Sequence, residues 1–322
     1  MTPRAAALAA SFLLAAVGAA GAAEPRDDAR ALALPADAAC RGAMRCLVAR
    51  AYAADPPAQR LALALFDEED DVAGVEGEKP MDGGFRGMLA LHPCLPVGKS
   101  RRQLAWVLAA ARELDAFFGR ELPAAAASGY RWRGLTFRFF RSTSAPPLAP
   151  TPRRTPSAYA VGPRPAPKDA KDDIPFSLGW NVDGSLLTDE ARVRETLFHE
   201  LFHINDERHG DWSPKALSAD YDAIVARCGA GNVACLRPYA PSATKVRGGT
   251  YYSFQPNNGE TVREYAAELA VRWYDEQRAV LAGRPLPGGA AFKCGPPENA
   301  RAWSALVQEF FGGADLVPPC RR

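Results

Sequence analysis

The segment His199-Glu200-Leu201-Phe202-His203 combines two imidazoles and a carboxylate at a spacing that suits a metal ion. Residues four apart on a helix project from one face, so His199 and His203 can bind the same cation. Zn²⁺ accepts histidine nitrogens as ligands and keeps a water in the open position of catalytic sites. Because zinc lowers the pKa of that water to about 7, Glu200 can accept its proton near neutral pH. The segment therefore predicts metal-assisted hydrolysis with Glu200 as general base.

A helix must present these side chains, and the surrounding sequence predicts one. Thr188 is a candidate N-cap, and Asp189 and Glu190 place negative charge in the first turn, where the helix dipole favours it. One apolar stripe follows at helical spacing and carries the helix to Asn205. The stripe consists of Val193, Leu197, Leu201 and Ile204.

The motif resembles the HExxH signature of the zincin metallopeptidases. The resemblance implies an α+β fold with a mixed sheet, an active-site helix and a C-terminal helical part that carries the third metal ligand. It also implies a zinc metalloendopeptidase that hydrolyses a peptide or protein substrate through an activated water, without a covalent intermediate.

Glu264 and Glu268 are the first candidates to complete the site. They lie four apart and share a helix face, and Leu269, Val271 and Trp273 continue that helix. The pair resembles the gluzincin arrangement, which implies Glu264 as third ligand and Glu268 as the residue that orients His199. The alternative is a solvated acidic face paired with neighbouring arginines.

His209 is the rival third ligand, because it follows His203 by six residues as in the metzincin pattern HExxHxxGxxH. Asp206 replaces the glycine of that pattern, and all four methionines precede the motif, so no Met-turn can follow it. Asp206 also fits the HExxHxxD variant of lethal-factor-like gluzincins. Asn257 stands where that group has a tyrosine seven residues before the glutamate ligand, which departs from the subfamily.

Two further segments are candidates for a role at the site. Tyr252, or its neighbour Tyr251, is a candidate donor to the oxyanion of the tetrahedral intermediate; ordinary aromatic packing in a strand is the alternative. Cys94, within His92-Pro93-Cys94-Leu95-Pro96, could cap a catalytic zinc as a latency thiolate, and a disulfide to Cys40 or Cys46 is the simpler interpretation.

The first 23 residues have the charge, apolar core and small-residue end of a signal peptide. We therefore expect a secreted or periplasmic chain without a membrane anchor after cleavage. The seven cysteines then become disulfide candidates, with Cys228/Cys235 and Cys294/Cys320 as plausible local pairs and one thiol left over.

The remaining sequence predicts an N-terminal helical or mixed region over 24–150 and a catalytic region over 151–322, whose sheet could begin near residue 130. A net charge of +2 and a pI near 8.2 argue against a nucleic-acid partner. We also expect the protein to be a monomer. A non-catalytic exported zinc-binding protein on a peptidase scaffold is the alternative function. The predicted elements are helices at 40–66 and 100–121 with Ser100 as cap, a loop at 67–84, strands at 132–140, 157–161 and 174–180, and a proline-rich segment at 146–175.

Overall fold

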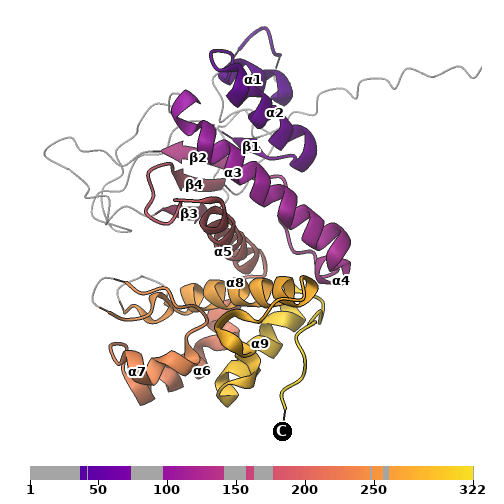
Figure 1. Ribbon diagram of the computed structural model, residues 1–322. Coiled ribbons are helices and arrows are strands. Elements are labelled where there is room, and N and C mark those ends of the chain that lie inside the picture. The colour runs from indigo at the N-terminus through magenta and orange to yellow at the C-terminus, as the bar shows by residue number, and fades with distance from the viewer. Residues whose placement is uncertain are drawn as a thin grey trace, which may run out of the picture.

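The computed structural model shows an α+β protein in which helices predominate around a four-stranded sheet (Figure 1). The predicted signal peptide, Cys94, Asn257 and most of the proline-rich segment lie outside the described residues. The structure describes residues 37–41, 43–73, 97–140, 157–162, 177–246, 249–256 and 261–321.

The sheet is mixed, as the sequence predicted, and its strand order is β1-β2-β4-β3. β1 pairs with β2 and β2 with β4 in parallel, whereas β3 pairs with β4 antiparallel and forms an edge of the sheet. The strands are β1 (Val72–Ala73), β2 (Thr136–Phe140), β3 (Ala158–Val161) and β4 (Ser177–Asn181).

Gly179 allows β3 and β4 to pack closely. It pairs with Tyr159 across the two strands, and a Cβ atom built on Gly179 would lie 2.3 Å from the Tyr159 ring. Only glycine leaves room for that ring over the strand. The strand predicted at 157–161 is confirmed as β3, and the one predicted at 174–180 is confirmed from Ser177 onward, since 174–176 lie outside the described residues. The strand predicted over 132–140 begins only at Thr136.

The helical structure predicted over 40–66 is present as two helices separated by a short turn. α1 (Met44–Ala51) ends before Asp55, whose side chain accepts a hydrogen bond from the Ala58 N–H and caps α2 (Pro56–Glu69). Consecutive prolines at the start of α2 cannot donate backbone hydrogen bonds within a continuous helix. The loop predicted over 67–84 is also corrected in part, because α2 extends to Glu69 and β1 follows it.

α3 (Val97–Ala116) continues as a π-helical turn over Phe117–Glu121, and the predicted helix at 100–121 is therefore present. Ser100 is not its cap, since the helix begins three residues earlier. The π-helical turn places Phe117 and Phe118 in the core, where Phe117 contacts the Tyr274 ring at 4.9 Å between centroids.

The HExxH segment lies within α5 (Glu190–Arg208), as predicted. Asp189 rather than Thr188 is the N-cap, because the Asp189 carboxylate accepts a hydrogen bond from the Arg192 N–H at 3.0 Å. Thr188 instead donates its hydroxyl to Asp189. The predicted apolar stripe is at most 1 % exposed at every position, so it faces the core.

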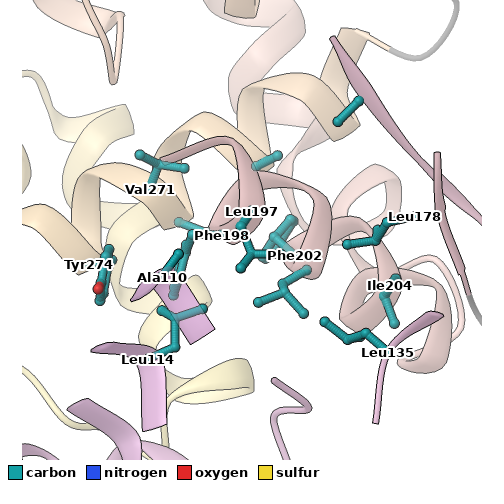
Figure 2. Packing of buried hydrophobic residues seen from close by; sticks show 14 of the residues in the cluster. Ala110, Leu114, Leu135, Leu178, Leu197, Phe198, Phe202, Ile204, Val271 and Tyr274 are labelled. Carbon is teal, nitrogen blue, oxygen red and sulfur yellow. The ribbon is translucent and has the colours of Figure 1, made fainter. Parts of the chain in front are cut away.

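α5 lies in the middle of the molecule (Figure 1). The sheet and α3 lie on one side of it, and the C-terminal helices lie on the other. Phe198 stacks on Tyr274 of α8 (Thr261–Leu281) with 4.4 Å between ring centroids, and Leu114 of α3 packs nearby (Figure 2). The C-terminal helices are α6 (Trp212–Cys228), α7 (Val233–Leu236), α8 (Thr261–Leu281) and α9 (Pro297–Phe310); the short α4 (Pro123–Ala126) follows the π-helical turn.

Three disulfides join the described cysteines: Cys40–Cys46, Cys228–Cys235 and Cys294–Cys320. Both predicted local pairs are confirmed, and the disulfide predicted from Cys40 or Cys46 to Cys94 is wrong, because Cys40 and Cys46 bond to each other. Within the described ranges, no helix has the length and apolar character needed to cross a bilayer. The sheet joins β1 and β2, which precede residue 150, to β3 and β4, which follow it. The division into an N-terminal region over 24–150 and a catalytic region over 151–322 stays a prediction.

Candidate metal centre

His199, His203 and Glu264 come together although α5 and α8 are far apart in sequence. The Nε2 atom of His199 lies 3.1 Å from His203 Nε2 and 3.1 Å from Glu264 Oε2, and His203 Nε2 lies 3.7 Å from the same oxygen. Among the residues that the structure describes, this is the one group of three or more histidine, cysteine or acidic side chains close enough to share a metal ion. The group could therefore hold a metal ion.

The spacing of these atoms agrees with tetrahedral coordination. Zn–N and Zn–O bonds of about 2.1 Å place the ligand atoms of a tetrahedral site about 3.4 Å apart. The three separations here, 3.1, 3.1 and 3.7 Å, scatter around that value. Two imidazoles and one carboxylate are also the ligand types of a catalytic zinc site. The residues present fit the ion.

Glu268 fixes the orientation of His199 from the opposite edge of the ring. Its Oε1 atom lies 3.2 Å from His199 Nδ1, and both side chains are buried. Donation from Nδ1–H to this carboxylate leaves the Nε2 lone pair directed at Glu264 and His203. Lone pairs that converge in a buried place repel one another unless a cation lies between them. The tautomer set by Glu268 therefore favours metal binding.

The charges around His199 also favour a cation. Burial lowers the pKa of His199, but its hydrogen bonds to Glu264 and Glu268 prevail and hold that pKa well above its usual value. Burial raises the pKa of Glu264, whereas its hydrogen bonds to His199 and His203 prevail and lower it. Both shifts have one physical cause: two carboxylates surround an imidazole that then prefers positive charge.

Glu200 lies on the face of α5 that turns toward β3. The side chain is 6 % exposed, and its carboxylate accepts a hydrogen bond from the backbone N–H of Ala160 on the edge strand. Burial raises the pKa of Glu200, and the imidazoles of His199 and His203 oppose that rise. Glu200 is thus a carboxylate with reduced solvation, held by the sheet beside the candidate metal ligands.

The two tyrosines after Gly249 differ in position. Tyr252 opens a 3₁₀ helix (Tyr252–Phe254), and its ring centroid lies 6.0 Å from that of His199. Tyr251 is buried and lies under the Lys245 ammonium at 5.4 Å. The structure therefore brings Tyr252 to the metal-ligand group, while Tyr251 packs in a short β-bridge with Lys245.

His209 lies away from this group. Its Nδ1 atom is 2.7 Å from Glu309 Oε1, and its ring packs on Phe310 at 4.7 Å between centroids. α5 continues through Asp206 to Arg208, so the chain does not turn sharply where metzincins have glycine. Six residues along a continuous helix rotate His209 by about 120° from His203, toward another face.

Asp206 has a structural role at the start of α6. Its carboxylate accepts hydrogen bonds from the Ser213 N–H at 2.7 Å and the Ser213 hydroxyl at 2.6 Å. It satisfies donors in the first turn of that helix, where backbone N–H groups lack intrahelical acceptors.

Glu113 of α3 connects the two helices that carry the ligands, a role that the sequence does not indicate. Glu113 Oε2 lies 3.2 Å from the Arg194 guanidinium on α5, and Oε1 accepts a hydrogen bond from the Tyr274 hydroxyl on α8 at 3.1 Å. Arg278 of α8 also pairs with Oε1. These contacts span helices distant in sequence, so only the three-dimensional structure reveals them.

No protein-family model matches the chain, and comparisons with curated proteins and with solved structures find no match.

Proposed function

We propose that this protein is an exported zinc-dependent metallopeptidase with a zincin-like catalytic fold. The observation that carries the proposal is the convergence of His199, His203 and Glu264 beside Glu200, which has no ligand role. His199, His203 and Glu264 would hold the ion as a three-ligand site, the arrangement that leaves one coordination position for chemistry. When bound there, Zn²⁺ polarises a carbonyl oxygen and lowers the pKa of water.

Glu200 acts as the general base and then as the general acid. It removes a proton from the attacking water while the water oxygen forms a bond to the scissile carbonyl carbon. It then passes that proton to the amide nitrogen as the carbon–nitrogen bond breaks. The hydrogen bond from Ala160 holds the Glu200 carboxylate in place, and burial of Glu200, which raises its pKa, favours proton exchange.

Tyr252 is the proposed second donor to the tetrahedral oxyanion. The Tyr252 side chain is half-buried near His199. A hydrogen bond from the Tyr252 N–H to the Thr244 carbonyl, at 2.9 Å, anchors the backbone of this segment. A donor fixed before the reaction stabilises developing charge more than a mobile one does.

The three disulfides fit an oxidising compartment, which supports the proposed secretion to the periplasm or cell exterior. The position of His209 beside Glu309 favours Glu264 over the metzincin alternative. A purely structural zinc would use four protein ligands, whereas the group found within the described ranges has three members. That count favours catalysis over a non-catalytic binding protein.

Peptide-library cleavage before and after metal removal tests the proposal. The mature chain should cleave internal peptide bonds, lose this activity on chelation and regain it with stoichiometric zinc. A protein that binds one zinc yet cleaves no peptide in a diverse library would support the non-catalytic alternative.

A further inference from the structure

A pocket of about 340 Å³ lies between α5 and the C-terminal part of α8. Its charged lining consists of Arg194 of α5, Asp275 and Arg278 of α8, and Arg284 beyond the end of α8. The helical rise of 1.5 Å per residue places Arg194 about 8 Å before His199 along α5. It places Asp275 about 16 Å beyond Glu264 along α8. The pocket is therefore separate from the candidate metal centre.

The arginines of α5 and α8 are held in place by Glu113 of α3, which lies outside the pocket lining. The Glu113 carboxylate lies 3.2 Å from the Arg194 guanidinium and also pairs with Arg278. The side chains of Arg194 and Arg278 are only 14 % and 20 % exposed. A guanidinium has five N–H donors, so one shared carboxylate leaves several of them for another acceptor. Two cationic groups are thus preorganised at the pocket.

Some of these donors and charges are not matched by acceptors. The Arg194 Nε–H is buried and has no hydrogen-bond partner in the described part of the chain. Such donors are rare, and a bound ion is one explanation for them. Arg284 is exposed and forms no ion pair with any described residue. Three arginines face one acid, Asp275, across the lining, so positive charge remains in excess even when Glu113 is counted.

We infer that this pocket binds a phosphate group. A phosphate offers more oxygen atoms than a carboxylate and can accept hydrogen bonds from three separate guanidinium groups at once. The volume of the pocket suits a small molecule, and Ala279, Pro285 and Pro287 add apolar surface beside the arginines. A small phosphate monoester fits this lining, and inorganic phosphate presents the same charged group. Such a ligand would join α5 to α8 whether or not the chain is a peptidase.

Two substitutions in the lining should change phosphate affinity in opposite directions. Arg284→Gln removes an exposed cation, and ion pairs at exposed positions change an equilibrium by about twofold to fivefold. We expect the phosphate dissociation constant to rise by about that factor. Burial raises the pKa of Asp275 to about 6, so its carboxylate is ionised at pH 7.5 and repels the anion. Asp275→Asn should therefore lower the dissociation constant.

Isothermal titration calorimetry on the full zinc-loaded chain, at pH 7.5 and constant ionic strength, tests the inference. Inorganic phosphate and phenyl phosphate should each bind at one saturable site. Tighter binding of phenyl phosphate would assign the pocket to organic phosphates, and equal binding would assign it to the free ion. The affinity should stay the same after zinc is removed. Arg60→Gln, which removes an exposed arginine of α2, is the matched control and should leave the affinity unchanged.

Four results would overturn the inference. The first is the absence of saturable binding of either probe. The second is binding that disappears with zinc, which would place the phosphate at the metal centre. The third is an equal loss in Arg284→Gln and Arg60→Gln, which would be an effect of net charge, and the fourth is weaker binding in Asp275→Asn. Peptide cleavage is measured separately, so the proposed function stands or falls independently of these results.

Discussion

Replacing Glu268 should weaken metal binding without removing a ligand. The Glu268 carboxylate lies 3.2 Å from His199 Nδ1, on the ring edge opposite the Glu264 contact, and both partners are buried. A hydrogen bond to a charged group contributes about 1.5 to 3 kcal/mol, equivalent to about tenfold to a hundredfold in an equilibrium constant. Loss of a carboxylate that supports a metal-binding histidine lowers metal affinity by a similar factor.

Competition with a chromophoric chelator measures this effect. The zinc dissociation constant should rise about tenfold to a hundredfold in Glu268→Ala and less in Glu268→Gln, whose amide oxygen can still accept from Nδ1–H. Glu309→Gln is the matched control, because it breaks a carboxylate–histidine pair remote from the centre, at His209. Unchanged affinity in Glu268→Ala would refute the orienting role. A loss as large as that of a ligand variant would make Glu268 a direct ligand instead.

Three further predictions concern the ligands, pH and stability. Glu264→Ala should cost more than a hundredfold in zinc affinity and His209→Ala less than twofold by the same competition assay; the reverse order would assign the third ligand to His209. In the metal-free protein the raised pKa of His199 stabilises the fold below about pH 6.5, and this stability is lost as pH rises through the folded-state pKa. Zinc binds the neutral imidazole, so the rise in melting temperature on adding zinc should grow from about pH 6 to about pH 8. A rise that stays constant over this range would contradict a raised His199 pKa caused by Glu264 and Glu268. Replacing both Cys294 and Cys320 by alanine should lower the free energy of unfolding by about 3.5 kcal/mol, because the disulfide between them closes a loop with a sequence separation of 26. Denaturant titration measures this loss, and a change below about 1 kcal/mol would contradict the chain-entropy explanation.

The residues of the candidate metal centre could be predicted because local periodicity places each pair on one helix face and a family resemblance joins the two pairs. His199 and His203 share a helix face by spacing alone, and so do Glu264 and Glu268. The apolar stripe of α5 further indicated which face would be buried, and the structure agrees. Spacing identified which residues share a helix face, whereas the pairing of Glu264 with the two histidines came from the resemblance to gluzincins.

The remaining features depend on contacts between distant segments. The hydrogen bond from Ala160 to Glu200 requires β3 to lie beside α5, and nothing local in either segment specifies it. Glu113 binds partners on two other helices for the same reason. At helix ends, neighbouring polar residues compete: Asp189 rather than Thr188 accepts the capping hydrogen bond, because its carboxylate reaches the Arg192 N–H. Such choices depend on backbone geometry that residue types alone leave open.

Glu200→Gln tests the central claim most directly, because the substitution keeps the size of the side chain and removes the base. Zinc content and peptide cleavage are measured on the same preparation. The account predicts one zinc per chain, as in the wild-type protein, with cleavage reduced by about a hundredfold or more. Wild-type cleavage by a zinc-loaded Glu200→Gln protein would contradict it.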